Sequence, residues 1–141
     1  MSAAVRSTVL ALAGCLAALP AAAEGWSPGP EPAVWSQTRQ QLQASGAMTD
    51  RPWQFMEALE TPAVMAGEYL SDRTRTTAGV EFEAALLLRR NGSEDWQVRE
   101  LTMRALCNQQ RLQRRSSDNQ WLDYVGRDDT ALKVAWICDV P

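Results

Sequence analysis

The sequence predicts an α+β fold in which a mainly antiparallel β-sheet carries one or two N-terminal helices and one disulfide. Three observations predict it. Apolar residues recur at helical spacing within residues 33–62, and they alternate with a period of two within residues 63–141. Beyond the first 23 residues, the cysteines are Cys107 and Cys138. The 141 residues leave room for one small domain once a leading segment is set aside.

Residues 1–23 have the features of a secretory signal peptide. Arg6 precedes an uncharged apolar run, and Ala21 to Ala23 supply the small residues of a cleavage site. The run is too short to span a bilayer as a stable helix. A second route stays open, because Leu12 to Cys15 resembles a lipobox in which the cysteine becomes lipidated. Simple cleavage is favoured, so we expect a periplasmic or secreted protein, with lipid anchoring in the cell envelope through Cys15 as the alternative.

If the protein is exported, the two remaining cysteines are expected to be oxidised. An oxidising compartment makes a disulfide between Cys107 and Cys138 the expected state. Closing a loop of about 32 residues restricts the unfolded chain by about 3 to 4 kcal/mol. A catalytic thiol is not expected, because the spacing is not Cys-x-x-Cys and the chain has no histidine to activate it. The missing histidine also excludes histidine-based triads and His-ligated metals.

Residues 24–32 contain three prolines and predict a linker or extended arm. A helix is predicted from Ala33 to Ser45, with Trp35 and Leu42 at helical spacing. A second short helix is predicted over Trp53, Met56 and Leu59 and would end at Thr61-Pro62. Together these helices form a helical arm at 33–62. We expect Trp35, Trp53 and Met56 to pack on the sheet rather than to stack against a ligand.

From residue 63 the period of two predicts a β-sheet domain at 63–141. Strands are expected at 64–70 and 80–90, joined by a polar connection at 71–79, and Asn91-Gly92 marks a hairpin turn. A three-residue loop, 91–93, would align Leu88 with Trp96 and Leu86 with Val98. A β-bulge near Arg99-Glu100 would then pair Ala84 with Leu101, Phe82 with Met103 and Val80 with Ala105.

Two further elements complete the predicted sheet. Residues 111–115 and 121–125 indicate a second hairpin around a turn at 116–119. A final strand is predicted at 132–140, where apolar side chains alternate with Lys133 and Asp139. Both cysteines then face the core, which favours their pairing across the sheet edge or end.

Four short motifs resemble those of the surface-adhesin protein E-like domain family. They are Tyr69-Leu70-Ser71-Asp72, Gly79-Val80-Glu81-Phe82, Arg104-Ala105-Leu106-Cys107 and Trp136-Ile137-Cys138. The resemblance covers about residues 64–141 and has no counterpart for the helical arm. It implies a mostly antiparallel sheet, a disulfide and no enzymatic activity in small exported bacterial proteins, some of which bind host matrix proteins.

A cluster of arginines is the strongest charged feature. Arg99, Arg104, Arg111, Arg114 and Arg115 surround a single acidic residue, Glu100, in a chain of net charge -3. The guanidinium fork suits phosphate, sulfate and carboxylate, so Arg104, Arg111, Arg114 and Arg115 are candidate ligands for an anionic glycan or lipid head group. Strand parity separates Arg114 from its two neighbours, which favours an ordinary solvated sheet face. The acidic net charge argues against nucleic acid.

No catalytic, metal or cofactor site is expected. Glu81 and Glu83 share a strand face, as glycoside hydrolysis requires of two carboxylates, but no cleft is recognisable around them. Asp128-Asp129 falls short of a calcium-loop spacing. The leading hypothesis is therefore an exported, non-enzymatic binding or adhesin-like module whose partner is a protein or another envelope component. The alternative is an accessory protein that binds an anionic small ligand, glycan or lipid head group through the arginine-rich strand.

Overall fold

A computed structural model describes residues 25–140. The predicted signal peptide and the predicted lipidation site at Cys15 lie outside these residues. The described elements follow one another as α1 (Ala33–Ala44), β1 (Gln54–Glu60), β2 (Val64–Arg75), β3 (Val80–Arg90), β4 (Gln97–Leu106), the short 3-10 helix η1 (Cys107–Gln109), β5 (Arg111–Arg115), β6 (Trp121–Tyr124) and α2 (Thr130–Cys138). The predicted antiparallel sheet with an N-terminal helix is confirmed.

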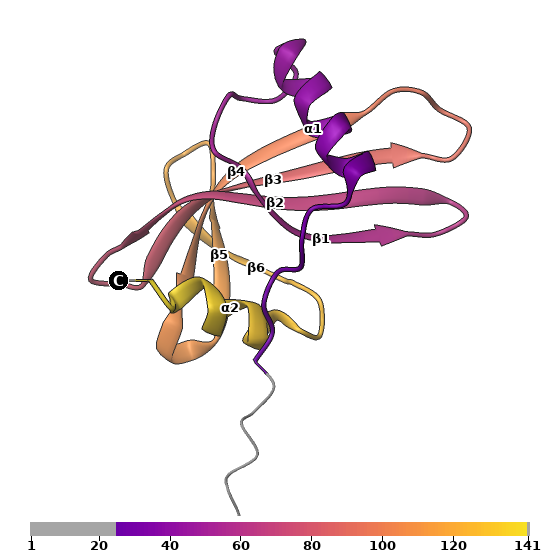
Figure 1. The fold of residues 1–141 in the computed structure, drawn as a ribbon. Coiled ribbons are helices and arrows are strands. Elements are labelled where there is room, and N and C mark those ends of the chain that lie inside the picture. Colours follow the sequence, from indigo (N-terminus) through magenta and orange to yellow (C-terminus); the bar gives the residue numbers. More distant parts are fainter. Residues whose placement is uncertain (1–24, 141) are drawn as a thin grey trace, which may run out of the picture.

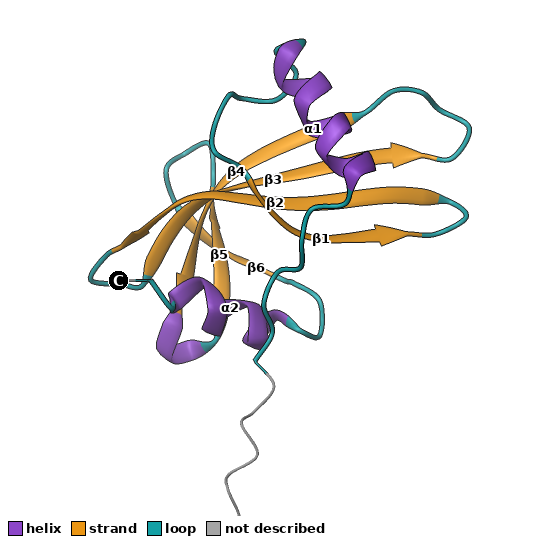
Figure 2. Ribbon diagram, in the orientation of Figure 1, coloured by secondary structure: helices purple, strands orange, loops and turns teal. Residues whose placement is uncertain are grey.

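The sheet is a meander, because the six described strands lie in the order in which they occur in the chain, each antiparallel to the next. The two helices lie on opposite faces of this sheet (Figure 1). Helix α1 lies over the part of the sheet formed by β1 to β3, where Trp35 is buried, whereas α2 packs against β4 and β5 on the other side. We name these two surfaces the α1 face and the α2 face. Figure 2 shows that each helix covers only part of its face.

The core of the α1 face is organised around Trp35, which is 1% exposed. Its indole ring lies directly on the backbone of Gly67, where an added Cβ would be 2.5 Å from the ring. The Tyr69 hydroxyl donates a hydrogen bond to the Trp35 carbonyl oxygen at 3.3 Å. Ala85 and Leu87 of β3 complete this cluster. A glycine in β2 therefore allows the helix to approach the sheet closely enough for its tryptophan to be buried.

The core of the α2 face holds the disulfide. Val80 and Phe82 of β3 pack with Val134 and Ile137 of α2. The predicted Cys107–Cys138 disulfide is confirmed, with Cα atoms 6.0 Å apart, and it joins η1 to the last residue of α2 rather than two strands. The segment before α1 is extended, as predicted. Its Trp26 packs edge-on against Trp136, with ring centroids 6.0 Å apart.

The second predicted helix, over residues 50–60, is wrong, so only the first part of the arm predicted at 33–62 is helical. Residues 54–60 form β1, which pairs with β2. A bulge between Phe55 and Glu57 sends Phe55 to the α1 face and both Met56 and Glu57 to the α2 face. The bulge shifts the alternation by one residue. The helix-like spacing of three between Trp53, Met56 and Leu59 thus occurs in a bulged strand, where Trp53 lies on the α1 face and Met56 on the α2 face.

The predicted C-terminal strand is also wrong, because residues 130–138 form α2. The buried side chains Lys133, Val134 and Ile137 follow helical spacing along one side. Apolar residues fill almost every position of this segment. Its sequence is therefore compatible both with the period of two of a strand and with the period of a helix. The disulfide at Cys138 and the contacts with β4 and β5 stabilise the helical alternative.

The register of β3 and β4 is correct at one end of the hairpin and wrong at the other. Val80 faces Ala105 and Phe82 faces Met103, as predicted, but the ladder contains no bulge and the connection spans residues 91–96 instead of 91–93. Leu88 consequently faces Gln97, and Trp96 instead packs against Trp35 on the α1 face, with ring centroids 5.5 Å apart. The longer loop, rather than a bulge, is the reason why even-numbered residues of β3 share a face with odd-numbered residues of β4.

The remaining predicted elements differ only in length. The second hairpin is confirmed as β5 and β6. Strand β2 is longer than predicted, because it continues beyond Leu70 to Arg75. A register shift lies between Ser71 and Thr74, where Asp72 has a φ of 59°. The polar stretch predicted as a connection is therefore largely strand.

Candidate functional site

The α2 face has an open apolar cavity of about 460 Å³ between the sheet and one side of α2. It exists because α2 covers only part of the sheet. On β3, Val80 and Phe82 are buried, whereas Leu86 and Leu88, further along the same face, are half-buried. The strands supply the floor, which includes Val64, Ala66, Leu86, Leu88 and Leu101. One wall is formed by α2 and by the loop that follows β6.

Exposed apolar side chains continue the cavity outward. Val125, in the loop after β6, is 94% exposed, and Leu59 of β1 is 41% exposed. Both residues line the cavity. Leu122 is also exposed and faces Arg114 across β5 and β6, on this same side of the sheet. A contiguous apolar surface of this kind on a small domain indicates a place where something binds.

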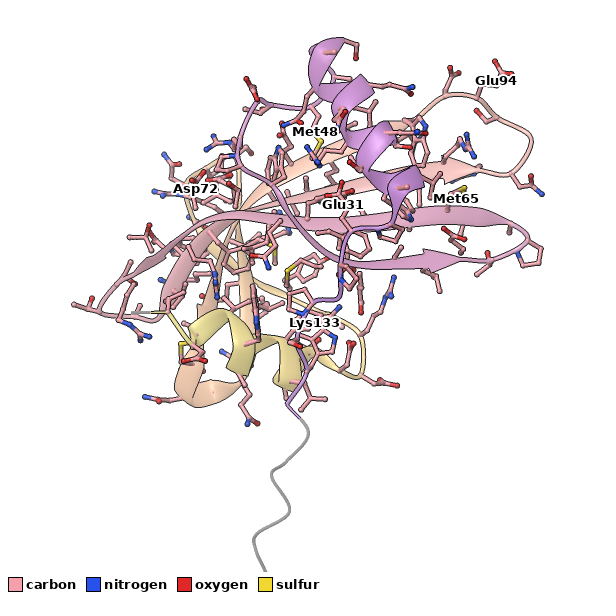
Figure 3. The ribbon with its side chains drawn as sticks, viewed as in Figure 1. Glu31, Met48, Met65, Asp72, Glu94 and Lys133 are labelled. Atoms are coloured by element: carbon pink, nitrogen blue, oxygen red, sulfur yellow. A yellow bond between two sulfur atoms is a disulfide. The ribbon has the colours of Figure 1, made fainter. Side chains whose placement is uncertain are left out.

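An ion-pair cluster closes the inner wall of the cavity, between α2 and strands β1 and β2. The Lys133 side chain is only 10% exposed, and its Nζ donates hydrogen bonds to Glu57 and, at 3.1 Å, to Glu68 Oε2. Asp129 Oδ1 lies 3.7 Å from the same ammonium. Arg127 contacts Glu57 at 3.2 Å and Glu68 at 3.9 Å. Lys133 lies where α2 meets the N-terminal segment (Figure 3), and its Nζ is 5.9 Å from the centroid of the Trp26 ring.

The Lys133 ammonium stays charged at neutral pH. Burial by itself lowers the pKa of Lys133, but the hydrogen bonds and charges of Glu57 and Glu68 outweigh it, and the pKa lies above its ordinary value. An amine nucleophile needs a lowered pKa. The arrangement thus gives Lys133 the chemistry of a structural cation that is hydrogen-bonded to two carboxylates.

The outer end of the same face is cationic. Arg99 lines the cavity and faces Leu86. Arg90 faces Val64 across β2 and β3, and Arg114 faces Met103 across β4 and β5. Residues directly opposite in a ladder share a face, so the three arginines border the apolar floor. Among residues 25–140, none of the three takes part in an ion pair.

The structure divides the four arginines proposed from the sequence as an anion site. Arg104, Arg111 and Arg115 lie on the α1 face, where the paired neighbours are Gln113 and Asp123, while Arg114 lies on the α2 face. Arg104 Nε donates to Gln113 Oε1 at 2.7 Å, and Arg111 lies 3.6 Å from Asp123. The four arginines therefore do not form one site.

A second feature of the α1 face is an arginine stack on Trp121. The guanidinium carbons of Arg104 and Arg115 lie 4.5 and 5.6 Å from the centre of its ring. Cation–π contacts of this kind hold arginines in place on an exposed sheet.

The candidate acidic groups have ordinary partners. Glu83 accepts a hydrogen bond from the Thr102 hydroxyl at 2.9 Å, and Glu81 faces Arg104 across the ladder. Asp129 belongs to the Lys133 cluster. In the described part of the chain, no group of three or more His, Cys, Asp or Glu residues is arranged to hold a metal ion.

Sequence reasoning missed both the cavity and the Lys133 cluster. The cavity depends on how far α2 reaches along the sheet, and the cluster depends on the bulge that turns Glu57 toward α2. One signal was present. Lys133 interrupts a strongly apolar C-terminal run, and a lysine in such a run needs an acidic partner when it is buried.

None of the helices within residues 25–140 has the length and apolar character needed to cross a membrane. Comparison of the chain with protein-family models, with curated proteins and with solved structures finds no match.

Proposed function

We propose that this chain is an exported, non-enzymatic binding module whose binding site is the cavity on the α2 face. The observation that carries the proposal is the open apolar volume of about 460 Å³. Sites for small ligands are concave, mostly apolar and about 300 to 1,000 Å³ in volume. Both cations of the inner wall, Lys133 and Arg127, are paired with carboxylates, so this wall presents an ion-pair cluster rather than a reactive group.

Export is the second part of the proposal. It rests on the signal-peptide features of residues 1–23, and the Cys107–Cys138 disulfide supports it because such bonds persist in oxidising compartments. The proposed location is the periplasm or the medium, or the cell envelope if Cys15 is lipidated. Mass spectrometry of the exported protein tests this, because cleavage after Ala23 and a lipid on Cys15 give different N-terminal masses.

The resemblance to the surface-adhesin protein E-like family stays a prediction. It supports a role as a binding module at the cell surface, with a protein or envelope component as partner. A pulldown from the native envelope tests the adhesin-like role. Capture that survives a cavity-blocking substitution would place the partner on another surface.

Binding of an uncharged naphthylamine fluorophore, followed by its fluorescence increase, tests the cavity directly. The variant Leu88→Gln removes an apolar side chain from the floor, and Val34→Gln is its matched control on α1, where Val34 is 50% exposed. Burying a leucine contributes about 1.5 to 3 kcal/mol, so we expect Leu88→Gln to weaken binding about tenfold or more. Thermal melts of both variants verify that they fold. Equal binding by Leu88→Gln and the unchanged protein would show that the fluorophore does not use this cavity.

A second candidate function is anion binding on the α1 face. It is favoured by the stack of Arg104 and Arg115 on Trp121, which offers an aromatic ring beside guanidinium groups to an anionic sugar. Retention on a sulfated-glycan column tests it. Arg104→Gln with Arg115→Gln should elute at lower salt than Arg99→Gln with Arg114→Gln, which removes the same charge from the α2 face. Equal loss in both variants would mean that net charge alone causes retention.

A further inference from the structure

We propose that the cavity holds a single acyl chain whose anionic head group is bound at the outer end by Arg90, Arg99 and Arg114. This inference rests on the proposed function of the cavity and adds the chemical class of its ligand. The ligand is a free amphiphile with one chain, such as a long-chain carboxylate.

The interior of the cavity suits a hydrocarbon chain. Its floor is built from the aliphatic side chains of Val64, Leu86, Leu88 and Leu101, and Ile137 continues the apolar lining onto α2. The volume of about 460 Å³ is at the lower end of the usual range for small ligands. A single flexible chain fits such a volume better than a folded protein element, which needs a larger interface.

The inner wall has no unpaired cation for an anionic head group, because its two cations face three carboxylates, Asp129 included. Lys133 is shared between Glu57 and Glu68, and Arg127 contacts the same two carboxylates. An anionic head group placed here would face these carboxylates as well as the cations. The polar end of an amphiphile therefore belongs at the other, open end of the cavity.

The open end supplies the complementary charge. Arg90, Arg99 and Arg114 come from three adjacent strands and face this side of the sheet, beside floor residues of the cavity. Arg90 and Arg99 are exposed and Arg114 is half-buried. Within the described residues they have no acidic partner, whereas Arg111 on the opposite face is paired with Asp123. Guanidinium groups bind carboxylate and phosphate oxygens through paired hydrogen bonds. A neutral or cationic amphiphile would gain nothing from them.

The test compares amphiphiles that share a chain and differ in the head group. Dodecanoate, dodecan-1-ol and dodecyltrimethylammonium, each below its micelle concentration, compete with the uncharged fluorophore for the full exported protein. We expect dodecanoate to bind at least tenfold more tightly than the alcohol and the cation to bind most weakly. Within a carboxylate series, affinity should rise by up to about fourfold for each added methylene.

Two triple variants locate the head group. Arg90→Gln, Arg99→Gln and Arg114→Gln together should abolish the preference for the carboxylate without changing the affinity for the alcohol. The matched control changes Arg89, Arg104 and Arg115 to Gln. These residues lie on the same three strands and carry the same total charge, but they face the α1 side. The control should retain the preference. Its loss in both variants would overturn the assignment, because net charge would then explain it.

The remaining outcomes separate this inference from the proposed function. If the fluorophore binds and the carboxylate and alcohol compete equally, the cavity is a binding site but the ligand class is wrong. If the fluorophore itself fails to bind, both proposals fail. Cosedimentation with phosphatidylglycerol vesicles adds one more outcome. Binding to vesicles through these arginines, with no competition by free dodecanoate, would show that the arginines bind a membrane surface and not a free amphiphile.

Discussion

Replacing Lys133 with methionine is expected to destabilise the fold through the carboxylates that the substitution leaves behind. Methionine keeps most of the apolar stem of the lysine, so the main loss is the positive charge. Glu57 and Glu68 lie directly opposite each other on β1 and β2, and both contact Lys133 Nζ. Like charges in directly opposed positions repel, and here they would do so on a partly buried surface.

The magnitude follows from burial. Leaving one half of a buried ion pair without its partner costs about 3 to 5 kcal/mol. The Glu57 and Glu68 side chains are 22% and 33% exposed, and Arg127 still contacts both, so water and Arg127 offset part of this cost. We expect a loss of about 2 to 3 kcal/mol in the free energy of unfolding. For a domain of this size, that loss corresponds to a melting temperature lower by about 8 to 12 °C.

Urea unfolding followed by tryptophan fluorescence measures this loss. The control is Arg127→Gln, whose side chain belongs to the same cluster but is 45% exposed and should contribute less than about 1 kcal/mol. A third variant combines Lys133→Met with Glu57→Gln and Glu68→Gln. It removes the stranded charges and should be more stable than Lys133→Met alone.

Two results would refute the reasoning. One is a Lys133→Met variant that is no less stable than Arg127→Gln. The other is a triple variant that is no more stable than Lys133→Met, because the loss would then come from packing rather than from unpaired carboxylates.

Three further predictions concern the disulfide, the contact between Trp35 and Gly67, and the pH dependence of stability. Changing Cys107 and Cys138 to serine should lower the free energy of unfolding by about 3 to 4 kcal/mol in urea titrations, and an unchanged midpoint would contradict a structural role for the disulfide. Gly67→Ala should cost about 1 to 3 kcal/mol in the same assay because its Cβ meets the Trp35 ring. Gly29→Ala, which has open space around it, is the control and should be neutral. Because the folded-state pKa of Lys133 is raised, its contribution is complete below the unfolded pKa of about 10.4 and is lost as the pH rises through the folded value. Urea midpoints between pH 8 and 11 should therefore fall more for the unchanged protein than for Lys133→Met, and parallel profiles would contradict the pairing.

The sequence predicted the centre of the sheet because the apolar residues there are compatible with only one pairing of β3 and β4. Val80 and Phe82 must face the same core as Met103 and Ala105, and a slip of one residue between the strands would turn the apolar side chains of one strand away from that core. The C-terminal element was compatible with two secondary structures. At 130–138 nearly every residue is apolar, so the strand and the helix both bury enough surface, and tertiary packing decides.

The candidate site was predictable only in part. Strand parity correctly separated Arg114 from Arg111 and Arg115. Alternation also put Leu86 and Leu88 on one face. It carried no information on whether a helix would cover them, because that depends on the length and placement of α2. An open cavity and a buried core have the same pattern in sequence.

The meander also constrains how the chain folds. Each strand pairs with neighbours that are adjacent in sequence, so the sheet has a low contact order and its hairpins can form one after another. Two other contacts join residues that are far apart in sequence. Trp26 packs on Trp136, near the opposite end of the chain, and Cys138 must reach back to Cys107. Local pairing along the chain can therefore form the sheet without α2, whereas the docking of the N-terminal segment and of α2 depends on contacts between residues far apart in sequence. Truncation near the C-terminus would accordingly leave a formed sheet with one apolar face uncovered, which is a species prone to aggregate.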